Sequence, residues 1–263
     1  MTEVGVHLTV TAVLLAVFHI TAMRAAEIPP GERRSGTAFM SPETQAMQED
    51  DRANPGMLAA LDGEALWNRE PLAGEPSCSG CHGDAATGMK GVAARYPAFD
   101  PARGRPVDLE ARINLCRTEH QHAAPLAWES RELLALSAYV AMQSRGVAIT
   151  AGADEASRPF VAAGRALFYR RQGQLDLSCA QCHDDNWGKR LAGSVIPQGH
   201  PTGYPEYRLE WQSVGSLQRR LRGCIVGVRA EPFAYGAPEM VELELYLMWR
   251  ARGMPMETPA VRP

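Results

Sequence analysis

Four stretches of the chain carry apolar residues at the three- and four-residue spacing of an amphipathic helix: 64–70, 132–145, 160–171 and 238–252. Two other segments, 83–108 and 184–208, are rich in Gly, Pro, Asp and aromatic residues and lack the sustained alternation of a β-strand. We therefore expect a mostly α-helical fold with long loops.

The apolar pattern repeats within the chain. Gly-Glu-Ala-Leu-Trp precedes Cys78 at the same interval at which Gly-Arg-Ala-Leu-Phe precedes Cys179 (78 − 63 equals 179 − 164). A Tyr-Pro dipeptide follows in each half, and each half ends with an apolar helical stretch stopped by Arg-Gly. We interpret the repeat as a duplication. The predicted domains are 57–146 and 160–263, joined by a linker at 147–159.

Each half contains one Cys-x-x-Cys-His motif. Two cysteines at this spacing can form thioether bonds to the vinyl groups of one haem, and the adjacent histidine can then ligate its iron. A zinc site built from both pairs would join ligands as far apart in sequence as Cys81 and Cys179 and leave the histidines unexplained. The motifs predict two covalently bound haem c groups in two tandem cytochrome c-like domains with long haem-wrapping loops. The predicted attachment residues are Cys78, Cys81, Cys179 and Cys182, and the predicted axial ligands are His82 and His183.

Two further cysteines lie at matched places in the halves. Cys116 follows Cys81 in the first half, and Cys224 follows Cys182 at a comparable interval in the second (116 − 81 against 224 − 182). Haem iron held by one histidine needs a sixth ligand or an open position, and a thiolate is a strong donor that lowers the reduction potential. We expect each thiol to ligate the iron of its own half. A disulfide between them, or two buried thiols, are the alternatives.

Methionines and other histidines are the competing sixth ligands. A methionine would indicate a high-potential electron carrier, but most methionines here fall on or beside apolar helices and are more typical of a core. His120 and His122 are two apart and do not face one iron from a single helix. We rank these candidates below the cysteines: Met142, Met240, Met248, Met254, Met256, His120, His122 and His200.

Charge and the amino terminus indicate the setting. The formal net charge is −3, and nothing favours nucleic acid binding. Arg219, Arg220, Arg222 and Arg229 flank Cys224 and favour a small anion there, although arginines on a solvated face that bind haem propionates are an alternative.

Residues 8–23 are nearly all apolar, too short to span a membrane comfortably, and Ala25-Ala26 follow. They predict a signal peptide at 1–26, although Glu3 and His7 stand where basic residues are usual and a retained anchor is the alternative. The expected location is the periplasm, with no membrane span in the mature chain.

Several segments resemble one known family, the diheme A subunit of the SoxAX cytochromes. They are 112–121 around Cys116, 220–233 around Cys224, the ending 246–253, and the stretch 40–56, which lies in an N-terminal extension at 27–56 and has no haem role. The resemblance covers the whole mature chain.

The resemblance implies an L-cysteine S-thiosulfotransferase. It implies that Cys224 is the active thiol, an axial ligand of the second haem and the site of a cysteine persulfide, that Arg220 binds thiosulfate, and that Cys116 ligates the first haem. It also implies a monohaem SoxX-type partner subunit, a SoxYZ-type carrier protein whose cysteine receives thiosulfate, and a cytochrome c electron acceptor. A periplasmic diheme electron-transfer protein without substrate chemistry is the alternative. A haem peroxidase would want an open iron position, against which the two matched thiols argue.

Overall fold

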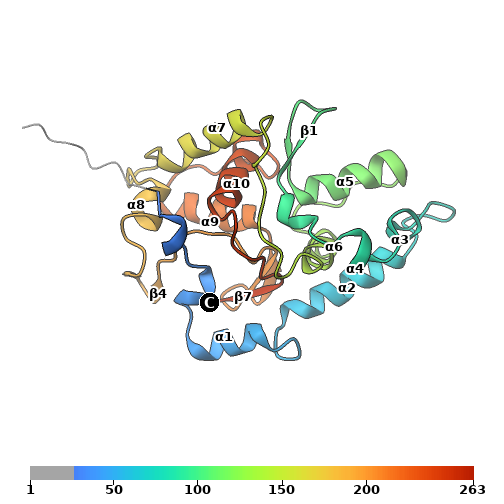
Figure 1. The fold of residues 1–263 in the computed structure, drawn as a ribbon, viewed down its shortest axis with the longest axis horizontal. Coiled ribbons are helices and arrows are strands. Elements are labelled where there is room, and N and C mark those ends of the chain that lie inside the picture. Colours follow the sequence, from blue (N-terminus) through green and yellow to red (C-terminus); the bar gives the residue numbers. More distant parts are fainter. Residues whose placement is uncertain (1–26) are drawn as a thin grey trace, which may run out of the picture.

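Residues 27–263 are described by the computed structural model of this chain (Figure 1). The predicted signal peptide, residues 1–26, lies outside the described residues. Most of the regular structure is helical, as expected, and short strands lie between the helices. Across residues 27–263, no helix is both long and apolar enough to cross a membrane.

The two halves share six elements in the same order, and they differ only between the motif helix and the next hairpin. The first half contains α2 (Gly56–Asn68), α3 (Cys78–His82), α4 (Ala85–Gly88), η3 (Ala93–Arg95), β1 (Ala98–Asp100), β2 (Arg105–Val107), α5 (Leu109–His120) and α6 (Arg131–Met142). The second contains α7 (Arg158–Tyr169), α8 (Cys179–His183), β3 (Arg190–Leu191), β4 (Ser194–Val195), β5 (Glu206–Arg208), β6 (Ser213–Gly215), α9 (Leu217–Gly227) and α10 (Pro238–Arg250). Where the halves differ, the first has α4 and η3 and the second has β3 and β4. In each half the first and last helices pack together, α2 on α6 and α7 on α10. The sequence repeat is therefore a structural repeat.

A glycine lies at each of these helix crossings. A Cβ atom at Gly63 would lie 2.7 Å from the carbonyl carbon of Ala135, and one at Gly164 would lie 2.6 Å from the carbonyl carbon of Glu242. Because glycine has no Cβ, the helices approach closely enough to bury Trp67 and Phe168. These aromatic residues are the last in the two matched pentapeptides that begin at Gly63 and Gly164.

Short strands occupy the two loops in which we expected none. β1 pairs antiparallel with β2, and β5 pairs antiparallel with β6 in the corresponding place. These strands have three residues each, too few to leave an alternating pattern in the sequence. The β3–β4 hairpin lies in the second loop, which is longer than the first between its motif cysteine and the Tyr-Pro (204 − 179 against 96 − 78).

The N-terminal extension lies against the second half. It comprises η1 (Pro30–Glu32), η2 (Gly36–Phe39) and α1 (Pro42–Glu49), and α1 packs on the C-terminal strand β7 (Ala260–Arg262). β7 runs parallel to β5 and makes the second hairpin a three-stranded sheet. The backbone N–H of Val261 donates to the Gln48 side chain at 3.1 Å, which ties the two ends of the chain together.

Buried carboxyl groups lie where the halves meet. The Gln218 side chain on α9 donates to Asp108, the N-cap of α5, at 2.7 Å and to Glu244 on α10 at 3.2 Å. Burial raises the pKa of Asp108 to about 6, and burial together with the charge of Asp108 raises that of Glu110 to about 8. Burial and the neighbouring carboxylates also raise the pKa of Glu244. The charged groups facing this cluster are Arg105, which acts on Asp108, and Glu129, which acts on Glu110 and is itself opposed by Arg219.

Candidate haem sites

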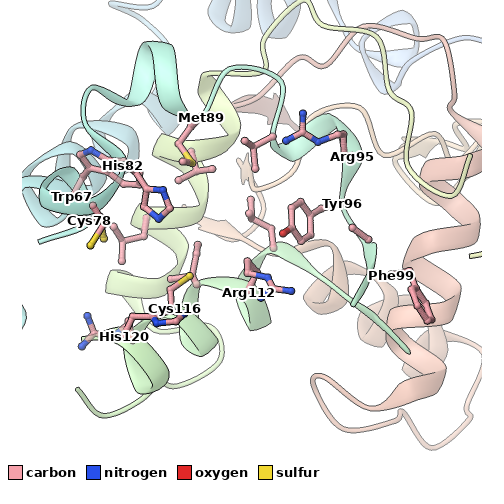
Figure 2. A pocket seen from close by; sticks show the side chains of 18 of the residues that line it. Trp67, Cys78, His82, Met89, Arg95, Tyr96, Phe99, Arg112, Cys116 and His120 are labelled. Carbon is pink, nitrogen blue, oxygen red and sulfur yellow. The ribbon is translucent and has the colours of Figure 1, made fainter. Parts of the chain in front are cut away.

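The first site is a cavity of about 840 Å³ between α3 and α5. Cys78, Cys81 and His82 line it from the motif helix, and Cys116 lines it from α5. Figure 2 shows His82 and Cys116 projecting into the same space from these two helices. Ser77 begins α3 as its N-cap, accepting a hydrogen bond from the backbone of Gly80 at 3.0 Å, which orients the motif.

This cavity fits a haem c group. Its volume lies within the roughly 300–1,000 Å³ of ordinary cofactor sites. Its donor set is the one haem c requires: two free thiols three positions apart, a histidine, and a second donor on the facing helix. The remaining wall is largely apolar, as a porphyrin needs, and includes Met89, Val92, Leu109, Ile113, Leu136 and Val140.

The second site brings three of its four predicted donors together in a smaller space; Cys182 lies on the same motif helix but does not line the cavity. Cys179, His183 and Cys224 line a cavity of about 180 Å³ between α8 and α9. The Nδ1 of His183 lies 2.7 Å from the carbonyl oxygen of Pro197, which orients the ring, and the ring hydrogen-bonds the Cys224 thiol. The donor set again fits haem iron, and a porphyrin here requires the contact between His183 and Cys224 to open.

The two thiols differ in their electrostatic surroundings. Burial raises the pKa of Cys116 more than the charge of Arg112 lowers it. Burial acts in the same direction on Cys224, but the hydrogen bond from His183 and the charge of Arg220 outweigh it and hold the pKa of Cys224 below its usual value. A thiolate is the reactive and ligating form, so Cys224 is the thiol better prepared for chemistry.

Arg220 is the cation that distinguishes the second site. It lies partly buried beside Cys224 in the same cavity, and no carboxylate of residues 27–263 forms an ion pair with it. Its counterpart Arg112 is held by Asp100, with 2.6 Å between Nη2 and Oδ2. The thiol of the second site therefore has a guanidinium next to it that no direct ion pair neutralises, and the charges of Glu206 and Glu210 act on that guanidinium from farther away.

The expected arginine cluster around Cys224 is smaller than the sequence suggested. Arg219 lies over the Trp211 ring, 4.2 Å from its centre, and Arg222 lies over Tyr235 at 4.6 Å. Arg229 is exposed, and neither it, Arg219 nor Arg222 lines the cavity. Successive residues of a helix point in different directions, so adjacency in sequence did not place these side chains together.

The competing ligands are mostly excluded by position. Cys116 and Cys224 are free thiols in separate cavities, so no disulfide joins them. Met240, Met248 and Met256 are buried in the core, and none of the five methionines considered lines either cavity. Two methionines that we did not consider do so: Met89 in the first and Met40 in the second.

Two of the histidines do reach the cavities. His120 lines the first and His200 the second, whereas His122 pairs with Glu75 at the surface. His200 is buried, its Nδ1 lies 3.0 Å from the carbonyl oxygen of Arg34, and burial lowers its pKa to about 4.

Sequence reasoning missed three polar residues of the second cavity. Tyr204, Glu206 and Arg208 line it from β5 and the loop before it. Tyr204 is partly buried, and burial together with Glu206 raises its pKa. The available signal was the repeat itself: Arg208 stands where the first half has Asp100, at the offset that also relates Cys224 to Cys116 (208 − 100 equals 224 − 116).

Comparisons with known proteins agree with this geometry. The family model for the SoxA/TsdA cytochrome c domain matches residues 62–149 and 163–256. The chain is 38% identical over 253 residues to the L-cysteine S-thiosulfotransferase subunit SoxA of Pseudaminobacter salicylatoxidans, covering 94% of this chain and 88% of that protein. It is 37% identical to the subunit of the same name from Rhodovulum sulfidophilum over 231 residues, or 88% and 80% of the two chains.

A solved structure shares the fold. The crystal structure of SoxXA from P. pantotrophus superposes with a TM-score of 0.84 at 33% identity, covering 88% of this chain and 87% of that one. Two cytochrome c domains, each with a haem-binding donor set, thus occur in the arrangement seen in that complex. The chain belongs to the SoxA family of c-type cytochromes.

Proposed function

We propose that this chain is the catalytic subunit of an L-cysteine S-thiosulfotransferase. It joins thiosulfate oxidatively to a cysteine of a SoxYZ-type carrier protein and passes two electrons to a cytochrome c acceptor. The relatives with this name cover most of the chain. The observation that carries the proposal is the position of Arg220, a partly buried guanidinium without an ion-paired carboxylate in residues 27–263, beside the Cys224 thiol.

The reaction needs a sulfur nucleophile, an electron acceptor and a cation. Joining thiosulfate to a carrier thiol forms one sulfur–sulfur bond and releases two electrons and one proton. Cys224 takes part as a cysteine persulfide that is the same before and after turnover, so both sulfur atoms of thiosulfate go to the carrier thiol, and Arg220 offsets the two negative charges of thiosulfate as it approaches this sulfur. Haem c bound at this site supplies the electron acceptor next to that sulfur.

The remaining residue roles follow the donor sets. Cys78 and Cys81 attach the first haem, and Cys179 and Cys182 the second. His82 and Cys116 would hold the first iron, and His183 and Cys224 would hold the second. Cys116 has a raised pKa and an arginine beside it that Asp100 neutralises, and both disfavour substrate chemistry at the first site.

The setting follows from the amino terminus and the relatives. The predicted signal peptide favours export to the periplasm, where thiols of c-type cytochromes acquire their haem. A monohaem SoxX-type subunit is the proposed partner in a heterodimer, because the matching solved structure is a SoxXA complex.

The test is intact mass together with turnover. We expect the periplasmic holoprotein to carry two haem masses and one extra sulfur, and to transfer electrons from thiosulfate when the carrier and the partner subunit are present. Cys224→Ala should lose the extra sulfur and the activity. Two haems without extra sulfur, and unaltered activity in the variant, would instead identify an electron carrier.

A second variant tests the cation. Arg220→Lys keeps the charge but loses the planar two-pronged grip on an oxyanion, so we expect a marked loss of turnover with both haems retained. Arg222→Lys is the matched control, because Arg222 lies on the same helix but packs on Tyr235. Equal activity of the two variants would remove Arg220 from the mechanism.

A further inference from the structure

The ligand helices of the two halves can be compared position by position. From the Tyr-Pro dipeptide to the spare thiol, the second half repeats the first at a constant offset in residue number (204 − 96 equals 224 − 116). The structure keeps the same register: β1 and β5, β2 and β6, and the N-caps Asp108 and Ser216 all correspond at this offset. A difference in charge at equivalent positions is therefore a difference between otherwise matched sites.

In the first half, the strand residue facing the arginine is acidic. Asp100 ends β1, its side chain is 6% exposed, and Oδ2 lies 2.6 Å from Nη2 of Arg112. Arg103 contributes a second, longer contact of 3.3 Å and also pairs with Glu119. Arg112 and Asp100 together have no net charge, so this matched pair does not itself attract an anion to Cys116; Arg95 and Arg117 also line the cavity.

In the second half, the equivalent strand residue is basic. Arg208 ends β5, its side chain is 10% exposed, and it lines the cavity that Cys224 and Arg220 also line. Its Nη1 and Nη2 lie 3.3 Å from Glu206 and Glu210, and its buried Nε has no hydrogen-bond partner in the structure.

The balance of charge in the second half is positive. Glu210 is 64% exposed, so water and salt screen its charge, whereas Glu206 is buried. Before Cys224 itself is counted, Arg208, Arg220 and Glu206 thus have a formal charge of +1, against zero for the matched pair in the first half; Arg262 also lines this cavity and is balanced by Glu257. A dianion that loses water on entering a cavity is stabilised only when enough positive charge replaces that water.

We propose that Arg208 is a second substrate-binding residue, which forms with Arg220 a two-guanidinium site for a dianionic sulfur oxyanion. The exchange of Asp100 for Arg208 confines this binding to the second half. Two planar guanidinium groups can bind the oxygens of one sulfonate end from two directions, and the unpartnered Nε of Arg208 is a free donor for this purpose. The inference rests on the proposed thiosulfotransferase activity and identifies what selects its substrate.

The test is steady-state kinetics of the holoprotein with its partner subunit and carrier. Arg208→Gln should raise the KM for thiosulfate and the inhibition constant of inorganic sulfate, an inert dianion, by roughly ten- to a hundredfold, with a smaller change in kcat. Arg208→Lys should recover part of the loss. Arg158→Gln, which makes the same change at an exposed arginine of α7, should alter neither constant.

A third variant separates substrate binding from a structural role. Glu210→Gln breaks one of the two ion pairs that Arg208→Gln breaks, the exposed one, but removes a negative charge, so it should not raise the KM. If Arg208 merely held the strand in place, both variants would lower the melting temperature and kcat together and leave the KM and sulfate inhibition unchanged, which would overturn the inference. Haem stoichiometry establishes that each variant is assembled. A wild-type protein inactive with thiosulfate would refute the proposed function itself.

Discussion

Replacing Gly164 with alanine tests why the repeat begins with glycine. In α7 this residue faces α10, and an added Cβ would lie 2.6 Å from the carbonyl carbon of Glu242 and 2.8 Å from the Cβ of Tyr246. Carbon atoms in contact are normally about 3.5–4.0 Å apart, so the two helices must separate by roughly 1 Å. The atoms in the way belong to backbone and to the base of a side chain, and no rotamer change moves them.

The expected cost follows from two opposing terms. Overpacking a core costs about 1–3 kcal/mol or more, and separation here also loosens Phe168 and Tyr246, both buried against this crossing. Alanine favours a helix over glycine by about 1 kcal/mol, which offsets part of that loss. We expect a net loss of about 2 kcal/mol, equivalent to a fall in melting temperature of roughly 4–8 °C for a chain of this size.

The assay is thermal and urea unfolding of the holoprotein, followed by circular dichroism. Gly223→Ala is the control, because Gly223 also lies inside a helix, α9, but its added Cβ would have no heavy atom within 4 Å. That variant should be as stable as the wild type or slightly more stable. If the two variants shifted stability equally, the close approach of α7 and α10 would not be what requires glycine at 164.

Three further predictions concern buried charge and the first haem. The folded state holds protons on Asp108 and Glu110 that the unfolded chain has released, so the stability that these two groups contribute is fully present below pH about 4 and is lost as the pH rises towards about 8. The free energy of unfolding should fall by about 1.4 kcal/mol per pH unit for each extra proton that the folded state holds. Urea unfolding midpoints at pH 5 and pH 8 should show a smaller fall in Glu110→Gln than in the wild type. An equal fall in the two proteins would contradict the protonation of Glu110 in the folded state. Arg250→Met leaves Asp184 as an unpaired buried carboxylate, because the pair is 2.7 Å apart and almost wholly inaccessible, and should cost about 3–5 kcal/mol by urea unfolding. Adding Asp184→Leu to this variant should restore much of that stability. If it restored none, the unpaired Asp184 carboxylate would not be the cause of the loss. Cys116→Met should raise the reduction potential of the first haem, within the roughly 0.8 V that axial ligands span, in a spectroscopic redox titration; an unmoved potential means that Cys116 is not a ligand.

The sequence was most informative where covalent chemistry determines spacing. The haem motifs, the repeat and the matched thiols could be predicted because each depends on fixed intervals along the chain, and the cavities bring Cys78, His82 and Cys116 together as expected. The strands could not be predicted, since three residues leave no period. Nearness in sequence also led us to expect Arg219 and Arg222 beside Cys224. In the structure they lie instead over the rings of Trp211 and Tyr235, outside the cavity.

Arg208 shows why part of the site was out of reach. It lies outside the helix that carries Cys224, on a strand whose existence the pattern did not indicate, and its role depends on which cavity that strand borders. Residue type alone does not separate it from the other arginines of the chain. Its position becomes informative only when the repeat is extended through the strands, where an aspartate and an arginine occupy the same place.

The parts of the chain that break the repeat gather around the second cavity. Gly36, Phe39 and Met40 of the N-terminal extension line it, as do the β3–β4 hairpin through Ser194 and Val195 and the chain end through Arg262 and Pro263. The first cavity is lined by residues 67–154 alone, and β7 has no counterpart beside it within residues 27–263. Duplication accounts for the cysteines and histidine predicted to bind haem in each half. Binding a haem does not require the added segments, which supply none of these residues. The added wall narrows access to Cys224 and Arg220, which is what a site must do to exclude water around a charged substrate. The asymmetry of the additions thus agrees with the asymmetry of charge, and both indicate that substrate chemistry takes place in the second half.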